Sequence, residues 1–139
     1  HADGSPARPL ILECIAQSGE FLSTTGQYER SSKLLVKIAG SEVSIWNASA
    51  GTWIQHPCVY DSRAGQFCSI TPLRIRIKDS FQLDPGVSDI NELDINRQNG
   101  SFRFSNTLAT PGVAPYRQTL EASGICRPTA EPAVAKRAF

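Results

Sequence analysis

The stretch INRQNGSFRF constrains the fold of this chain more than any other part of the sequence. At its centre, Asn99-Gly100 lies between two runs of alternating apolar and polar residues. This dipeptide is the strongest short-range signal for a β-hairpin, because a type I′ turn needs positive φ at both central positions. A two-residue turn there gives four cross-strand pairs: Gln98 with Ser101, Arg97 with Phe102, Asn96 with Arg103, and Ile95 with Phe104. The sequence therefore predicts a hairpin with one apolar face, made by Leu93, Ile95, Phe102 and Phe104.

Other segments point to strands as well, and none shows convincing helical periodicity. Residues 73–78 (LRIRIK) alternate between aliphatic and basic side chains, which predicts a strand with one buried and one wet face. The runs Lys33–Ala39 and Glu42–Trp46 flank a Gly-containing connection and predict a second hairpin. About eight β-prone segments follow one another, from Leu10–Ala16 to Tyr116–Ser123. We expect an all-β fold, an antiparallel β-barrel or sandwich of about eight strands.

The length of 139 residues is typical of one domain. We expect a flexible N-terminal arm at residues 1–9, a single β domain at 10–127 and a mobile C-terminal tail at 128–139, because both ends are rich in proline and small residues. The net charge of +1 provides no field that would steer the protein to nucleic acid. No apolar run approaches the ~20 residues that a membrane-spanning helix needs. We expect a monomer that binds a protein partner.

Four cysteines, Cys14, Cys58, Cys68 and Cys126, form an even set without CxxC spacing. Only one internal histidine, His56, accompanies them, so we expect no metal site. Of the three possible disulfide pairings we favour Cys14–Cys126 with Cys58–Cys68; four free thiols remain the alternative. Disulfides form in oxidising compartments, so we expect a periplasmic or extracellular protein. The chain begins at His1 and contains no Met, which favours a signal peptide that has been removed.

Catalytic signatures are missing from the sequence. It contains no GxSxG, HExxH or glycine-rich phosphate loop, and His56 has no evident partner for nucleophilic catalysis. The carboxylates Asp79, Asp84, Asp89, Glu92 and Asp94 cluster where Asp ordinarily forms turns, although a hydrolase that uses a pair of them stays a remote alternative. We therefore expect neither an enzyme nor a bound cofactor.

The candidate binding residues surround the predicted disulfide loop. A Cys58–Cys68 bond would close a preorganised loop whose side chains can contact a protein partner, namely Tyr60, Asp61, Arg63 and Phe67. Arg74 and Arg76 would lie beside this loop and add positive charge to the contact surface. In the hairpin only Arg97 is a binding candidate, because it falls on the line of the apolar face next to the turn. Trp46 and Trp53 are either core residues or exposed aromatics of the type found in binding hot spots.

Several motifs resemble those of small exported proteobacterial proteins of unknown function. They are an early cysteine in LECIA, the strand LDINRQNGSF with its INRxxG pattern, and a closing Gly124-Ile125-Cys126 before a tail that ends in KRAF. The chain is also loosely similar to periplasmic inhibitors of c-type lysozyme, small antiparallel barrels whose early and late cysteines pair. The Ser-Ala-Ser-Gly inhibitory loop of that family is absent, and Ser49-Ala50-Gly51 is only a faint echo of it. The resemblance implies a compartment and no activity.

These observations together predict a secreted or periplasmic non-catalytic binding protein. It would act as an inhibitor, an immunity-type protein or an envelope accessory protein, through the disulfide-closed loop. The alternative is a lipocalin-like carrier of a small apolar ligand. That alternative requires an open apolar interior, whereas a core filled by large side chains would contradict it.

Overall fold

The computed structural model of the chain describes residues 8–22, 30–48, 50–56, 67–84, 86–110 and 116–133. Within these residues every regular element is a β-strand. The strands in chain order are β1 (Leu10–Gly19), β2 (Phe21–Leu22), β3 (Arg30–Ser31), β4 (Lys33–Ala39), β5 (Glu42–Asn47), β6 (Thr52–His56), β7 (Phe67–Ile70), β8 (Arg74–Asp84), β9 (Val87–Asn96), β10 (Ser101–Thr110) and β11 (Tyr116–Pro128).

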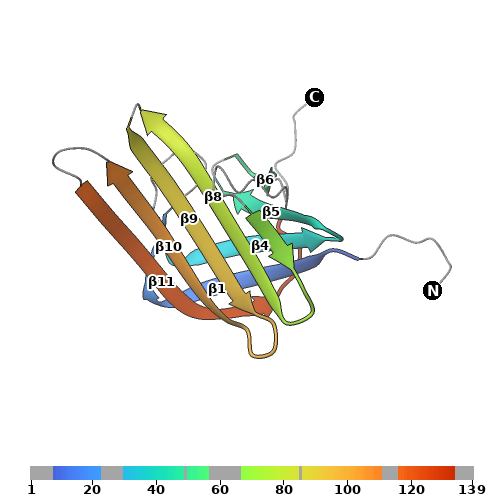
Figure 1. Cartoon of the computed structure of the whole chain (residues 1–139). Helices are drawn as coiled ribbons and strands as arrows, with labels where there is room; N and C mark the ends of the chain where they lie inside the picture. The colour runs from blue at the N-terminus through green and yellow to red at the C-terminus, as the bar shows by residue number, and fades with distance from the viewer. Residues whose placement is uncertain are drawn as a thin grey trace, which may run out of the picture.

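Nine of these strands form one antiparallel sheet in the order β6-β5-β4-β1-β11-β10-β9-β8-β7, which curls into a half-barrel. In Figure 1, β8 to β11 lie side by side in front, and β1, β4 and β5 cross behind them at a steep angle. The short strands β2 and β3 pair with each other. The predicted all-β antiparallel fold is confirmed, with more strands than the eight expected because β2, β3 and β7 are only two to four residues long.

The core lies on the inner face of the curled sheet, between its two halves. Alternation along each strand sends aliphatic and aromatic side chains inward, and both halves contribute buried residues. Phe21 of β2 is buried on this inner face and stacks on Phe102 with ring centroids 5.2 Å apart. The ring of Phe104 lies at the same distance from Phe21 in a tilted arrangement. The largest fully buried side chains are Val36, Val43, Ile75 and Ile95.

The first and last long strands meet at the middle of the sheet. Cys14 of β1 lies directly opposite Cys126 of β11, and their sulfur atoms form a disulfide, which confirms the predicted pairing. Gly124 lets the two strands approach here, because a Cβ on it would lie 2.1 Å from the carbonyl oxygen of Ile15. Cys68 is also disulfide-bonded. Its predicted partner, Cys58, lies outside the described residues.

The β9–β10 hairpin has a different register from the predicted one. Phe102 faces Ile95 rather than Arg97, and Phe104 faces Leu93, so the pairing is displaced by two residues. The loop contains four residues, Arg97 to Gly100, instead of two. Because side chains alternate with a period of two, this displacement leaves the predicted apolar face intact: Leu93, Ile95, Phe102 and Phe104 are all buried.

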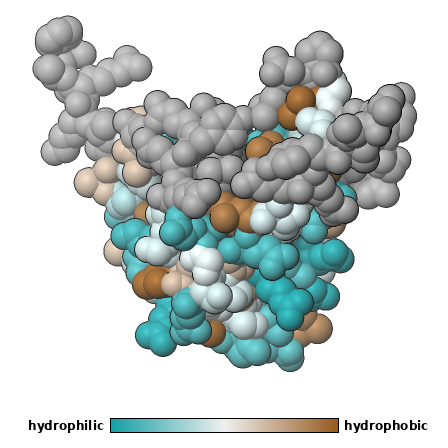
Figure 2. All heavy atoms as spheres, turned by 90° about the vertical axis from the view of Figure 1, so that its left-hand side faces the viewer, coloured by the Kyte–Doolittle hydropathy of each residue, from teal (hydrophilic) through white to brown (hydrophobic). Residues whose placement is uncertain are grey.

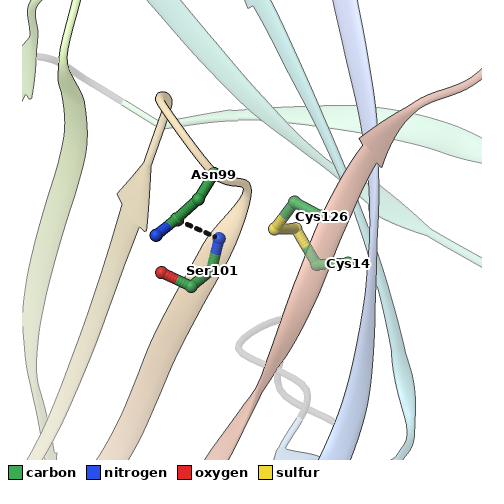
Figure 3. The surroundings of a disulfide bond; sticks show 4 residues. All are labelled: Cys14, Asn99, Ser101 and Cys126. Atoms are coloured by element: carbon green, nitrogen blue, oxygen red, sulfur yellow. Dashed lines mark hydrogen bonds between the residues drawn. A yellow bond between two sulfur atoms is a disulfide. The ribbon is translucent and has the colours of Figure 1, made fainter.

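Local hydrogen bonds explain the longer loop. Among the described residues positive φ occurs only at glycine, so Gly100 has φ +79° while Asn99 does not adopt the conformation that a type I′ turn requires. The side chain of Asn99 instead accepts the backbone N–H of Ser101 at 2.9 Å, as Figure 3 shows beside the disulfide. The Gly100 carbonyl then accepts the N–H of Cys126 at 2.7 Å, which fixes the hairpin to β11.

Two further strands differ from the expectation at their ends. Leu73 is 56% exposed and precedes β8, so only Ile75 and Ile77 of the LRIRIK run are buried as predicted. In the middle of the sheet β11 continues past Ser123 to Pro128, because it pairs with β10 in its first part and with β1 in its last.

We predict that Gly100→Ala destabilises the protein more than Gly40→Ala. Both glycines have positive φ, which costs a residue with a side chain about 1–2 kcal/mol. A Cβ at position 100 would also lie 2.6 Å from the backbone oxygen of Cys126, whereas position 40 faces open space. Urea denaturation should therefore show an additional loss of roughly 1–3 kcal/mol for Gly100→Ala. Equal losses in the two variants would contradict this account of the hairpin.

Candidate functional site

Strand register brings the charged residues of four strands together on the outer face of the sheet. Two aligned rows cross it: Arg76, Asp94, Arg103 and Ser123 form one, and Lys78, Glu92, Ser105 and Glu121 form the next. Arg74 lies beside the first row. We call this surface of β8–β11 the charged face. Figure 2 views the side on which β10 and β11 lie in Figure 1 and shows a mainly hydrophilic surface below the grey segments.

A depression with a volume of about 560 Å³ lies on the charged face. Ser18 of β1 reaches it because the pairing of β1 with β11 shifts between Ala16 and Ser18. Three carboxylates, one guanidinium and three hydroxyls provide its polar lining: Glu92, Asp94, Glu121, Arg103, Ser18, Ser105 and Ser123. Such a surface can bind a polar partner through charge-assisted hydrogen bonds. Phe104 and Ala122 complete the lining and add apolar area to it.

Asp94 organises the charges on this face. Arg74 donates through Nε to Oδ1 of Asp94 at 3.1 Å and through Nη2 to Oδ2, which is a bidentate pair. This hydrogen bonding, together with the charge of Asp94, raises the pKa of the Arg74 guanidinium further above its usual range. Arg76 approaches the same carboxylate at 3.9 Å. Arg103 faces Asp94 from β10 and forms no ion pair within the described part of the chain, so its guanidinium remains available.

The structure places several of the predicted binding residues together. The guanidinium carbon of Arg76 lies 5.3 Å from the ring centroid of Phe67, and Arg74 follows on the same side of β8. Phe67 therefore extends the charged face toward the β7 edge of the sheet, next to Arg74 and Arg76. Tyr60, Asp61 and Arg63 lie outside the described residues.

Arg97 has a different neighbourhood from the one that the sequence indicated. Its Nη1 donates to the carbonyl oxygen of Thr71 at 2.8 Å, and its backbone N–H donates to Leu73 at 2.9 Å. Arg97 therefore ties the β9–β10 loop to the β7–β8 turn. Its side chain is exposed rather than directed along the apolar face, which assigns it a structural contact at this end of the sheet.

A second polar cluster lies on the inner face, where the sequence suggested only turn chemistry. Asp79, Asn91 and Asn106 are aligned across β8, β9 and β10 and are buried. The Asn106 amide donates to Asp89 Oδ1 at 2.5 Å and to Asn91 Oδ1 at 2.7 Å. Burial raises the pKa of Asp89 above its ordinary value of 3.8, and the hydrogen bond from Asn106 partly opposes this effect. The amide nitrogen of Asn91 is buried without a hydrogen-bond partner.

The sequence contained a signal for this inner cluster. Asp89 and Asn91 have the same alternation phase as Leu93 and Ile95, and Asn106 has the phase of Phe104. If the alternation is continued past Leu93 and Phe104, these polar side chains fall on the same buried face of the sheet. In the described residues no group of three or more His, Cys, Asp or Glu side chains could hold a metal ion. The same residues include no helix of sufficient length and apolarity to cross a membrane.

No protein-family model, curated protein or solved structure matches this chain.

We predict that Asp89→Asn stabilises the protein at neutral pH and not in acid. Because the folded-state pKa of Asp89 is raised, folding favours its protonated form, and the ionised form reduces stability at any pH above the folded pKa. An asparagine can still accept the Asn106 hydrogen bond. Urea denaturation should show a gain in the free energy of unfolding at pH 7, which disappears as the pH falls below about 4.

Asp94→Asn is the matched control for this prediction. It removes the same charge from the outer face, where Arg74 and Arg76 bind the carboxylate. Exposed ion pairs contribute about 0.2–1 kcal/mol, so this variant should lose a little stability at pH 7. A loss of stability for Asp89→Asn at pH 7, or a gain independent of pH, would contradict the assignment of Asp89 as a buried, unfavourably ionised group.

Proposed function

We propose that this protein is an exported, non-catalytic binding protein whose partner is another protein. The observation that supports this proposal is the depression on the charged face, with the unpaired guanidinium of Arg103 among the carboxylates Glu92, Asp94 and Glu121. Arginine and aromatic residues are enriched among the residues that dominate binding energy. A surface of alternating charges discriminates between partners by electrostatic complementarity.

The binding surface extends from the charged face toward the β7 edge. Phe67, Arg74 and Arg76 border it there, and the segment with Tyr60, Asp61 and Arg63 directly precedes β7 in the sequence. In this proposal the Cys58–Cys68 loop contributes aromatic contacts and the strands contribute a rigid charged platform. The roles that such a protein can have are those of an inhibitor, an immunity-type protein or an envelope accessory protein.

Export is the second part of the proposal, and the disulfides support it. Cys14 and Cys126 are bonded, and Cys68 is also oxidised, as is usual in the periplasm or outside the cell. The competing carrier function has less support, because the buried rings of Phe21, Phe102 and Phe104 pack against one another and occupy this part of the core. The hydrolase alternative retains Glu92 and Asp94, which line one depression, but ion pairs with Lys78 and the β8 arginines already engage both.

We predict that Arg103→Ala weakens partner binding at least tenfold. The wild-type protein, immobilised with intact disulfides, would capture its partner from an envelope extract, and mass spectrometry would identify it. Calorimetry with the purified partner then measures the affinity of the wild type and of each variant. A truncated hot-spot residue costs more than about 1.4 kcal/mol, which is a factor of ten in affinity.

Lys33→Ala is the matched control for this experiment. Lys33 is a cation of similar exposure on β4, in the other half of the sheet, where its Nζ lies 3.7 Å from Glu13. Its removal should leave partner affinity unchanged. The charged face is not the binding surface if Arg103→Ala and Lys33→Ala bind alike. A repeat with reductant shows whether the affinity depends on the disulfide-closed loop.

A further inference from the structure

The outer face of β4–β6 carries an aromatic cluster that the charged face does not include. Trp46 of β5 lies opposite Trp53 of β6, and their rings meet edge to face with centroids 5.2 Å apart. Both side chains point outward, because their neighbours in the alternation, such as Val43 and Ile45, fill the core. The two tryptophans therefore lie on the outer surface rather than in the core. Both are half-buried there.

Two hydrogen-bond donors in this cluster converge on a single carboxylate oxygen. Trp53 Nε1 donates to Oε1 of Glu131 at 3.1 Å, and Lys37 Nζ lies 3.3 Å from the same oxygen. The Lys37 ammonium is also 5.2 Å from the centroid of the Trp53 ring, a cation–π distance. The side chain of Lys37 is 24% exposed, compared with 56% for Lys33 on the same strand. Lys37 is thus held in place by its surroundings, unlike an ordinary surface lysine.

The donors and the acceptor differ in how the fold holds them. Lys37 and Trp53 belong to paired strands of the sheet, whereas Glu131 belongs to the irregular segment that follows β11. The Thr129 N–H donates to Ile11 at 2.9 Å and brings this segment to the sheet. The two donors, Lys37 and Trp53, are therefore fixed by the sheet. The acceptor, Glu131, lies in a segment that forms no strand.

We propose that Lys37 and Trp53 form a carboxylate-binding site for an acidic peptide of a partner, and that Glu131 occupies this site within the chain until the peptide displaces it. A cation and an indole N–H directed at one point match a carboxylate, and Trp46 provides an apolar wall beside it. The neighbouring β6 is an end strand of the nine-stranded sheet, an arrangement to which an extended peptide can add by strand pairing. The site lies on a surface separate from the charged face, so a peptide bound there would be a contact beyond the proposed function.

Glu131 competes with an acidic peptide for Lys37 and Trp53, and this competition lowers the affinity of the wild-type protein for the peptide. A tethered group acts at an effective concentration of about millimolar, so Glu131 masks the site against weak acidic ligands. Its removal leaves Lys37 and Trp53 in place, because both belong to strands. An acidic peptide should then bind more tightly than it does to the wild-type protein.

Peptide titrations test the proposal with tryptophan fluorescence and calorimetry as readouts. The probe is a blocked tetraglutamate peptide, and a blocked tetraglutamine peptide is its uncharged match. The proteins are the wild type, Glu131→Gln, and Glu131→Gln combined with Lys37→Gln. Glu13→Gln is the control variant, because Glu13 is another glutamate paired with a lysine on this half of the sheet. Near-ultraviolet circular dichroism verifies that each variant is folded.

We expect Glu131→Gln to bind tetraglutamate at least tenfold more tightly than the wild type and Glu13→Gln do. The added Lys37→Gln change should abolish this gain, and tetraglutamine should bind to none of the proteins. The proposal is overturned if Glu131→Gln does not increase the affinity, if the gain persists without Lys37, or if tetraglutamine binds equally well. In each of these cases the Glu131 contact only holds the terminal segment to the sheet.

Discussion

The pairing of β1 with β11 is the interaction on which the rest of the structure depends. Strands β4 to β6 join the sheet through β1, and strands β7 to β10 join it through β11, so the two halves are hydrogen-bonded to each other only at this pair within the nine-stranded sheet. The Cys14–Cys126 disulfide crosses the pair and links residues 112 positions apart. On the chain-entropy model, a bond that closes a loop of about 100 residues contributes roughly 4.7 kcal/mol.

The same junction determines which surfaces the protein can present. Because the sheet curls around one core, each half has an outer face, and strand register gives the two faces different chemistry. The half of β8–β11 aligns alternating charges around Asp94 and Arg103. The half of β4–β6 presents a tryptophan pair beside Lys37. A separation of the halves would open the core and distort both faces, so the binding that we propose for them would depend on this junction.

Alternation made much of the fold predictable from the sequence. It identified the inward residues of the β9–β10 hairpin correctly although the predicted register was displaced by two residues, because such a displacement preserves the face of every side chain. The loop length could not be predicted from Asn99-Gly100 alone. It depends on the long-range hydrogen bond between Gly100 and Cys126, which exists only after β11 has joined the sheet.

The candidate sites were less accessible to sequence reasoning for the same physical reason. The cations of LRIRIK were visible as a stripe, but their partners Glu92 and Asp94 became evident only with the β8–β9 register. The contact of Glu131 with Trp53 joins residues 78 positions apart, and no local pattern indicates it. Local periodicity therefore predicts which face a residue occupies, whereas the composition of a site depends on the strand order.

Hydrogen–deuterium exchange of the wild type and of a Cys14→Ser/Cys126→Ser variant tests the central claim most directly. If the β1–β11 junction holds the two halves as one cooperative unit, the amides of β4–β5 and those of β8–β9 share one opening free energy in the wild type. In the variant they should then lose protection together, by a similar amount. The account would be contradicted if protection fell only in β1 and β11, or if one half kept its wild-type protection while the other exchanged freely.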